Sequence, residues 1–534
     1  MAEDAGLLRK DLIIANGIDA VSGEYALPPL TPADMKQGII TGGVKEPESK
    51  ALKSWLQKRR EKKFTLQEGL DPRRLDEAGW GIVFPVNTDP AVIEALRPLM
   101  EHRKAQAGEL YREYADNPKG AVRPVGVDNK GAWLGRQGAE NYGPVDPVKV
   151  PYYLLLVGSP EEIDYRFQYQ LDVQYAVGRI HFDTPEGYAR YAERVVQAES
   201  QSVKRKRRLT FFGPANPGDA ATDMSAQYLI QPLVDYTASL SIPNQAAWDV
   251  QKVLREPATK ARLGSLLAGN ENPGLLFTAS HGMAFHMDDA RQQPQQGALL
   301  CQDWPGPGWR GGIPEDFYYS AEDLPSDANL AGLIAFFFAC YGGGTPQYDE
   351  FYRTAFKDRG PIAERSFVAR LPQKMLEQGA LAVIGHVERA WGYSFIAGDG
   401  LSLGAFRSAL RALMSGAPVG YAFEYFNERY AELTTDLTDK IQSEDWDPVD
   451  PIAMASAWTA TNDAKNYMVL GDPAARVLVG ADLRDEAAIV LPEAQLEVAA
   501  ALEQPVQQEV VEDIPHDEAI AAAADEAAED VAGG

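Results

Sequence analysis

The chain of 534 residues is poor in cysteine and histidine, with only two of the first and six of the second. Two cysteines, Cys301 and Cys340, cannot form the disulfide framework that holds small secreted domains together. The few cysteines and histidines also lack the spacing of a zinc site. We therefore expect no metal and no cofactor, and each cysteine is a candidate free thiol.

Long hydrophobic runs are also missing. The longest apolar runs have about eight residues, whereas a bilayer-spanning helix needs about 20. The first residues, MAEDAGLLRK, contain no apolar core of a secretory signal. These features predict a protein of the reducing cytoplasm that does not enter a membrane.

Positive charge is scarce, because the formal net charge at pH 7 is −26. Such an excess of acid argues against nucleic acid or an anionic membrane as a partner. No Lys or Arg follows Arg484, and the acidic residues beyond it hold about half of the net charge. We expect residues 483–534 to form an acidic, disordered tail.

Apolar strand-like segments alternate with helix-like segments from residue 80 onward. This alternation predicts an α/β fold, with a mostly parallel sheet and helices on both faces. The predicted strands lie within 80–86, 152–158, 175–182, 203–213, 274–282, 333–344 and 380–391. The predicted helices lie within 184–200, 224–240, 248–269 with an interruption near Pro257, 364–379 and 405–416. Residues 115–148 are predicted to form a long loop.

Two residues with chemical potential stand at the ends of predicted strands. His281 ends GLLFTASH and Cys340 ends LIAFFFAC, and the carboxyl ends of parallel strands meet at one edge of a sheet. A histidine can generate the thiolate that makes cysteine a nucleophile. The N–H groups of Gly282 and Cys340 could hold an oxyanion. A packed histidine and a buried structural cysteine remain the alternatives.

Three glycines follow the thiol in ACYGGGTP. Glycine adopts backbone conformations that other residues avoid. We expect residues 342–344 to let the chain turn sharply and to admit an extended substrate.

The order of several short motifs resembles the caspase-like cysteine peptidases of clan CD. SHG is followed by AC with a glycine-rich loop and then by AVIG, and the gingipain-type and CHAT branches are most similar. YYLLLVGSPEEI, GRIHF, GALLCQDWPG and YMVLGDPAARV extend this resemblance over about residues 150–480. It implies a caspase-like (caspase-hemoglobinase) fold with two gingipain-like subdomains. It also implies a thiol protease in which His281 is the catalytic histidine and Cys340 the nucleophile.

The resemblance also suggests residues of a substrate pocket. It places Asp223, with Asp219 as an alternate, where a carboxylate would pair with Arg or Lys. Trp391 would cover the aliphatic stem of that residue, and His386 would line the pocket. A helix N-cap for Asp223 and a packed histidine for His386 remain open. The segment TFFGPANPG (210–218) lacks the acid that gingipains have there, so we expect a His–Cys dyad oriented by a backbone carbonyl.

These expectations divide the chain into four parts. A polar accessory segment with little core (1–75) precedes a first α/β subdomain (76–203), a caspase-like catalytic subdomain (204–482) and the tail (483–534). The basic run KRKRR (204–208) reads as an exposed linker that the enzyme, or an upstream activating protease, could cut. The expected function is endopeptidase cleavage of protein substrates, in bacterial stress or antiviral defence by analogy. The alternative is a catalytically silent caspase-like scaffold or binding module.

Overall fold

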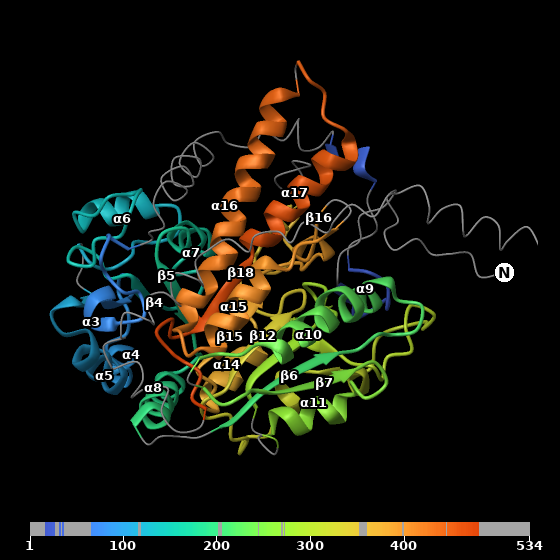
Figure 1. The fold of residues 1–534 in the computed structure, drawn as a ribbon, viewed down its shortest axis with the longest axis horizontal. Helices are drawn as coiled ribbons and strands as arrows, with labels where there is room; N and C mark the ends of the chain where they lie inside the picture. The colour runs from blue at the N-terminus through green and yellow to red at the C-terminus, as the bar shows by residue number, and fades with distance from the viewer. Residues whose placement is uncertain are drawn as a thin grey trace, which may run out of the picture. The chain divides into compact units, whose positions relative to one another are not determined.

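The main element of the fold is a ten-stranded sheet, whose strands lie between residues 80 and 471 of the chain (Figure 1). The computed structural model describes residues 17–26, 31–33, 35–36, 66–115, 119–200, 205–243, 245–268, 271, 273–351, 360–397, 400–444 and 446–479. The predicted acidic tail, 483–534, lies outside the described residues.

The sheet consists of two parallel halves that run in opposite directions. Its order is β3-β2-β4-β5-β18-β15-β12-β8-β6-β7, and each neighbouring pair is parallel except β15 with β18. The strands are β2 (Trp80–Val83), β3 (Tyr111–Tyr114), β4 (Tyr153–Val157), β5 (Ala176–Ile180), β6 (Lys206–Gly213), β7 (Asp249–Leu254), β8 (Pro273–Ala279), β12 (Ile334–Phe338), β15 (Ala382–His386) and β18 (Tyr467–Gly471). The predicted mostly parallel α/β sheet is confirmed.

A second, four-stranded sheet has the order β1-β9-β10-β11. Its strands are β1 (Gly17–Asp19), β9 (Gly282–Ala284), β10 (Leu299–Leu300) and β11 (Tyr318–Tyr319). Two-stranded ribbons are formed by β13 (Gly344–Thr345) with β14 (Phe367–Val368) and by β16 (Ile396–Ala397) with β17 (Gly400–Leu401). The N-terminal part, expected to carry little core, thus supplies a strand to this second sheet.

Helices cover the large sheet. As a result, seven of its strands are buried at every position. In one group of helices, α8 packs against both α5 and α14. In another group, α15 packs against both α10 and α16. The α-helices are α3 (Leu75–Ala78), α4 (Pro90–Ala95), α5 (Arg97–Ala107), α6 (Lys130–Arg136), α7 (Tyr165–Asp172), α8 (Pro185–Ser200), α9 (Ala220–Met224), α10 (Gln231–Ser239), α11 (Lys260–Leu267), α12 (Gln292–Gln295), α14 (Arg370–Glu377), α15 (Gly404–Met414), α16 (Val419–Ser443) and α17 (Pro451–Lys465). A π-helical turn (225–230) joins α9 to α10.

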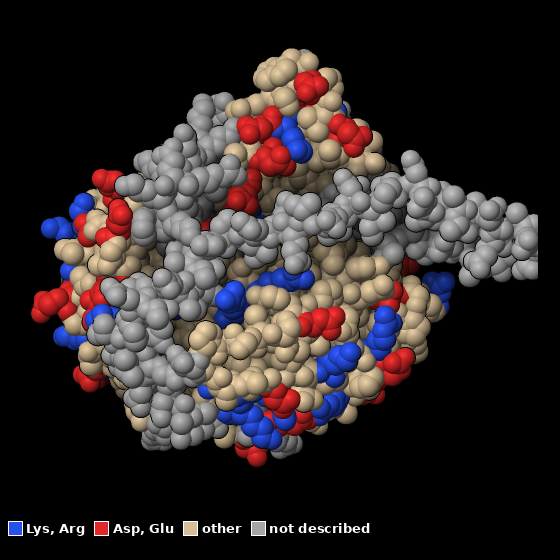
Figure 2. Space-filling view, in the orientation of Figure 1, with Lys and Arg blue, Asp and Glu red and all other residues tan. Residues whose placement is uncertain are grey.

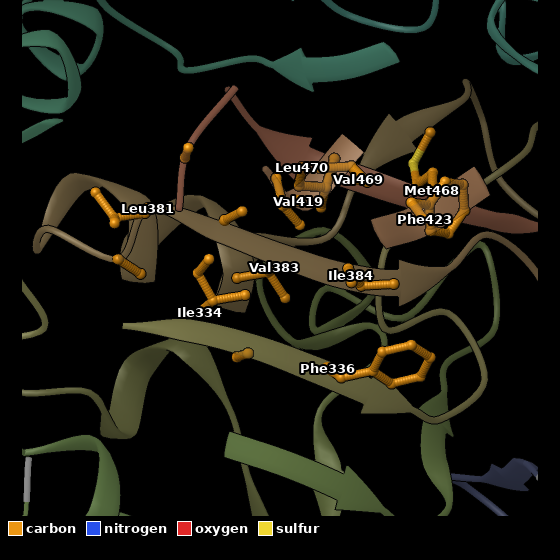
Figure 3. Close-up of a cluster of buried hydrophobic side chains, with 14 of the residues drawn as sticks. Ile334, Phe336, Leu381, Val383, Ile384, Val419, Phe423, Met468, Val469 and Leu470 are labelled. Atoms are coloured by element: carbon orange, nitrogen blue, oxygen red, sulfur yellow. The ribbon is translucent and has the colours of Figure 1, made fainter. Parts of the chain in front are cut away.

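The centre of the core lies where the two half-sheets meet. Figure 3 shows apolar side chains of β12, β15 and β18 packed together with those of α16. Phe336 of β12 lies 5.6 Å from Phe426 and 5.8 Å from Phe406, measured between ring centroids. Because β12 carries Cys340 just beyond its end, this packing fixes the base of the candidate site.

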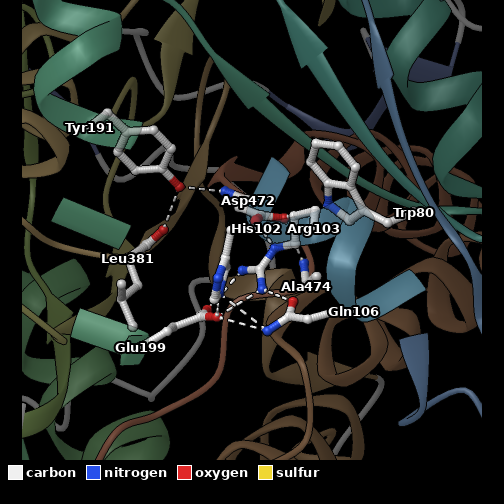
Figure 4. A network of polar contacts seen from close by, with 9 residues as sticks. All are labelled: Trp80, His102, Arg103, Gln106, Tyr191, Glu199, Leu381, Asp472 and Ala474. Carbon is white, nitrogen blue, oxygen red and sulfur yellow. Dashed lines mark hydrogen bonds and ion pairs between the residues drawn. The ribbon is translucent and has the colours of Figure 1, made fainter. Parts of the chain in front are cut away.

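A buried ion-pair network ties the closing segment after β18 to the first half of the sheet (Figure 4). Arg103 of α5 donates to Asp472 at 2.7 Å and to both carboxylate oxygens of Glu199 at 2.7 and 2.8 Å. Asp472 also accepts from the indole of Trp80 at 2.9 Å, and its amide donates to the Tyr191 hydroxyl at 2.6 Å. Burial alone would raise the pKa of Glu199, but Arg103 and His102 lower it well below its usual range.

Three sequence-based expectations about local structure are wrong. The helix expected over residues 248–269 is wrong before its interruption near Pro257, where strand β7 forms, and is confirmed after it, where α11 forms. β7 is an edge strand in which only Val253 is buried, so it lacks the apolar alternation that marks a strand. Residues 115–148, expected to be a loop, contain α6.

The basic run is the third correction. Arg205 is buried, and its guanidinium donates to the backbone oxygens of Ala331 at 2.6 Å and Asn329 at 2.9 Å. The following residues belong to β6, where Arg208 pairs with Asp249 at 2.7 Å. Residues 205–208 are therefore part of the sheet and not an exposed linker, because backbone carbonyls satisfy the buried charge.

Acidic and basic side chains lie interspersed over the described residues on the face shown in Figure 2. Within the described ranges, no helix is both long and apolar enough to cross a membrane.

Replacing Arg103 with Leu should lower the free energy of unfolding by about 3–5 kcal/mol, because two buried carboxylates would lose their cation. Chemical denaturation at pH 7 measures this loss. The matched control is Arg97→Leu on the same helix. Among the described residues, Arg97 makes two ion pairs, both 3.7 Å long and at the surface, so this change should alter stability by less than about 1 kcal/mol. Equal effects of the two substitutions would contradict the assigned role of the network.

Candidate active site

The pairing of β8 with β12 brings His281 and Cys340 to the same edge of the sheet. The two strands are parallel, and Ala279 is the register partner of Phe338. His281 comes two residues after Ala279, and Cys340 comes two residues after Phe338. The two side chains therefore lie equally far beyond the last paired residues of their strands. The amide of Ser280 still donates to the oxygen of Phe338 at 3.1 Å. The sequence-based expectation that the strands carry these residues to one edge is thus met.

Gly282 packs directly on the backbone of Cys340. A β-carbon at Gly282 would collide with the Cys340 carbonyl oxygen and would lie 2.9 Å from its amide nitrogen. Contacts that short are sterically forbidden, so only glycine fits at the first position of β9, directly after the histidine. The close approach puts the backbones of Gly282 and Cys340, the two expected oxyanion donors, side by side.

The imidazole of His281 is held by a carboxylate. Its Nε2 lies 2.8 Å from Oδ2 of Asp219, and both side chains are completely buried. The other ring nitrogen, Nδ1, has no hydrogen-bond partner among the described residues. The ring also lies edge-on to Tyr25 and Trp304, at centroid distances of 6.0 and 5.9 Å. Asp219 therefore fixes the ring and leaves Nδ1 available.

The expectation of a dyad oriented by a backbone carbonyl is corrected by this contact. Asp219 is the N-cap of α9, with its carboxylate accepting from the amide of Thr222 at 3.1 Å. It stands six residues beyond the end of β6 at Gly213, outside the segment where an acid was sought. The sequence predicted Asp219 only as an alternate pocket residue. Spacing along the sequence does not show that this loop folds back onto His281.

The loop that carries Asp219 is fastened to the segment after β10. The side chain of Asn216 donates to the backbone oxygens of Cys301 at 3.0 Å and Trp304 at 2.8 Å. A β-carbon at Gly306 would collide with the carbonyl oxygen of Pro217. The segment 301–306 thus positions Asp219. The thiol of Cys301 is buried and donates to the oxygen of Leu299 at 3.3 Å, which is a structural contact.

The charge of Asp219 is stabilised inside the protein. Burial alone would raise the pKa of this carboxyl group, but the charge of His281 and hydrogen bonds from His281, Thr222 and Tyr25 lower it to about 2. The hydroxyl of Tyr25 donates to Oδ1 at 2.8 Å. At neutral pH Asp219 is therefore an anion, and its Oδ2 lies against the imidazole of His281.

The thiol of Cys340 is also completely buried. Its Sγ accepts a hydrogen bond from the amide of Ala390 at 3.2 Å. Burial raises the pKa of the thiol to about 12, although the Ala390 amide and the charge of Arg389 oppose this rise. In the structure as it stands, Cys340 is a protonated thiol at neutral pH.

A buried charged cluster, Asp349–Arg389–Glu388, lies next to the loop after Cys340. Arg389 pairs with Asp349 and with Glu388 at 2.8 Å each. The amide of Tyr341 donates to the oxygen of Glu388 at 2.5 Å, and both residues have left-handed backbones, with φ of +58° and +76°. Such conformations cost energy outside glycine and often occur at functional sites.

The structure gives a different reason from the expected one for the three glycines at 342–344. The left-handed residue after the thiol is Tyr341, and none of residues 342–344 has a positive φ. Gly343 is closely approached by the backbone of Gly385, and a β-carbon at Gly344 would collide with the Tyr165 hydroxyl. All three glycines are buried, so they serve close packing rather than entry of a substrate.

Comparison with protein-family models identifies the family of the chain. The model of peptidase family C25 matches residues 147–478, more than half of the chain. The chain belongs to peptidase family C25. It is accordingly a cysteine peptidase of the caspase-like clan, and its substrates are proteins, as the resemblance of its motifs had predicted.

The solved structures that match this C25 peptidase share little sequence with it. A structure described as "Structure of Protease" has 14% identity and a TM-score of 0.44, and the alignment covers 78% of this chain and 81% of that one. The separase of the Saccharomyces cerevisiae separase–securin complex has 11% identity and a TM-score of 0.27, covering 60% of this chain and 16% of separase. No curated protein matches the chain significantly.

Trp391 and His386 share a partner, because Asp463 contacts both of them, whereas Asp223 lies on α9. Asp223 is half-exposed on α9 and pairs with Arg255 at 2.9 Å. Trp391 is buried, with its ring centroid 4.8 Å from that of Phe351 and its amide donating to Asp463 at 2.9 Å. Asp219, not Asp223, is the N-cap of α9, so the alternative interpretation of Asp223 as the cap is wrong.

His386 is a packed histidine at the end of β15. Its Nε2 lies 3.3 Å from Asp463, and its ring lies edge-on to Tyr467 at a centroid distance of 4.2 Å. It is completely buried. Within the described ranges, no group of three or more His, Cys, Asp or Glu side chains is arranged to hold a metal ion.

Asp219→Asn should remove stability that depends on pH. The carboxyl pKa falls from 3.8 to about 2 on folding, which corresponds to about 2 kcal/mol. Because the folded pKa is the lower one, this stability is present above pH 4 and is lost as pH falls towards 2. Denaturant midpoints of wild type and variant should therefore differ at pH 7 and converge in acid.

The control for this experiment is Asp223→Asn on the same helix. Asp223 pairs with Arg255, and both side chains are about half-exposed, so the change should cost less than about 1 kcal/mol at any pH. A difference between wild type and Asp219→Asn that stays constant down to pH 2 would show that Asp219 is not a stabilised anion.

Proposed function

We propose that this C25 peptidase cleaves peptide bonds with Cys340 as nucleophile, His281 as general acid and base, and Asp219 as the residue that positions His281. The observation that carries the proposal is the register of β8 and β12, which sets both side chains two residues beyond paired strand ends. The close approach of Gly282 to the Cys340 backbone supports it further.

The reaction follows from these positions. Nδ1 of His281 takes the thiol proton as Sγ of Cys340 bonds to the scissile carbonyl carbon. The N–H groups of Gly282 and Cys340 donate to the oxyanion that forms. His281 then gives its proton to the leaving amine, so that the C–N bond breaks and a thioester remains. Water, deprotonated by His281, hydrolyses the thioester and restores the thiol.

Asp219 acts through the imidazole. Its anion faces Nε2 at 2.8 Å and favours the imidazolium that exists between the two proton transfers. It also fixes the ring in the orientation that presents Nδ1. The proposed unit is therefore a Cys–His pair with a carboxylate behind the histidine.

Cys340→Ala and His281→Ala should each lower kcat/KM by at least about a thousandfold. The first removes the nucleophile, and the second removes the base that takes its proton. Cys301→Ala is the matched control and should retain activity, since that thiol is structural. The assay uses fluorogenic peptides with and without a thiol alkylator. Alkylator-insensitive cleavage, or no cleavage of any peptide or protein substrate, would favour the silent scaffold over the enzyme.

We further propose a preference for Arg or Lys before the cleaved bond, with Asp223 as the pocket carboxylate and Trp391 and His386 beneath the pocket. The support is the resemblance to gingipains and the surface position of Asp223, where Arg255 already binds it. A substrate cation would replace Arg255.

Asp223→Asn should lower kcat/KM for Arg-ended peptides by about tenfold or more and leave Asp-ended peptides unaffected. Asp235→Asn, which changes an exposed carboxylate on α10, is the control. Cleavage selective for Asp-ended peptides would contradict a basic preference.

The biological setting is proposed by analogy alone. We place the enzyme in the cytoplasm, acting on one or a few proteins in stress or antiviral defence, with an upstream protease as activator. Mapping of new protein N-termini in cells with the wild type or Cys340→Ala would test this, and identical maps under stress and infection would contradict it.

A further inference from the structure

The N-terminal strand β1 lies along the strand that follows His281. β1 pairs in parallel with β9, with Gly17 opposite Gly282 and Asp19 opposite Ala284. The amide of Ala20 donates to the oxygen of Ala284 at 2.8 Å. Strand β1 therefore occupies the edge of β9, which is where an extended peptide could add as a strand.

The beginning of β1 reaches the thiol. A β-carbon at Gly17 would lie 3.0 Å from Sγ of Cys340 and 3.2 Å from its Cβ. These distances are at the limit of steric contact, so backbone, and not a side chain, fills the space beside the sulfur. Gly17 thus stands where the backbone of a substrate would have to pass Cys340.

The end of the same segment covers the histidine. The chain turns at residues 20–23 and returns, so that the amide of Ala26 donates to the oxygen of Gly17 at 2.8 Å. The returning Tyr25 lies edge-on to His281 and donates to Asp219 at 2.8 Å. One short hairpin therefore contacts all three residues of the proposed catalytic unit.

Side-chain packing holds the hairpin in place. Ile18 and Ala20 are buried in a small cluster with Met283, Trp304 and Ile313. Asp19 closes the turn by accepting from the amide and hydroxyl of Ser22, at 2.7 and 2.8 Å. Val21 at the tip is half-exposed and takes no part in this packing.

We propose that residues 17–26 keep the peptidase latent by occupying the edge of β9 beside Cys340 and His281, where an extended substrate chain would bind. Displacement of the hairpin would open the edge of β9 and uncover Cys340 and His281 together. This inference rests on the proposed function, because it takes Cys340 and His281 as the reacting pair. It also predicts what binds to this edge of β9: an extended chain with a small residue at the thiol and an aliphatic residue, like Ile18, next to it.

Alkylation of Cys340 in the full chain tests the cover without relying on activity. Wild type, Ile18→Asp and Tyr25→Ala are treated with iodoacetamide at pH 7, and modification of each cysteine is followed by peptide mass spectrometry. Ile18→Asp places a charge in the apolar cluster and should speed alkylation of Cys340 at least tenfold. Tyr25→Ala should act in the same direction, while Val21→Ala, at the exposed tip, should react like the wild type.

Two further arms make the result decisive. Cys301, which is completely buried, should stay unmodified, and its modification in Ile18→Asp would mark unfolding and leave the decision to Tyr25→Ala. Adding the peptide GIDAVSGEYA, the sequence of residues 17–26, should slow alkylation of Cys340 in the opened variants, whereas a scrambled peptide should not.

Equal alkylation of Cys340 in the wild type and in Tyr25→Ala, or no protection by the peptide, would overturn the proposal. Faster alkylation with no peptide cleavage in any variant would support the cover and contradict the proposed function. Faster alkylation together with faster cleavage supports both.

Discussion

The candidate site depends on one structural constraint, the in-register parallel pairing of β8 with β12. The partnership of Ala279 with Phe338 decides where the chain leaves the sheet on both strands. A shift of one residue would turn every side chain of a strand to the opposite face. Phe336, held by the aromatic rings of α15 and α16, makes such a shift costly. Packing in the core therefore sets the geometry of the proposed chemistry at the sheet edge.

Polar contacts then complete what the sheet begins. Asp219 reaches His281 because Asn216 and Pro217 fasten its loop to the segment after β10. On the other side, the cluster of Asp349, Arg389 and Glu388 supports the strained backbone around the thiol. Each contact replaces hydration that burial removes. The site is thus pre-arranged, and the hairpin of residues 17–26 lies across it.

Much of the fold could be predicted from the sequence, because apolar strands buried on both faces leave a clear pattern. The runs LLFTA, IAFFF and AVIG became β8, β12 and β15, and their ends gave His281 and Cys340. β7 was missed because an edge strand buries few side chains. The role of Asp219 was missed because helix capping and histidine binding use the same carboxylate, and only the folded loop shows the second contact. A parallel strand from residues 17–19 has no local signal, since its partner lies more than 260 residues away.

The central claim is that Cys340 reacts with a carbonyl carbon held by Gly282 and flanked by His281. The most direct measurement is a crystal structure of the enzyme reacted with a peptidyl fluoromethyl ketone. The account predicts a thioether at Sγ of Cys340, with Nδ1 of His281 facing the inhibitor and residues 17–26 displaced from β9. Attachment at another residue, or a reacted Cys340 with His281 turned away from it, would contradict the account.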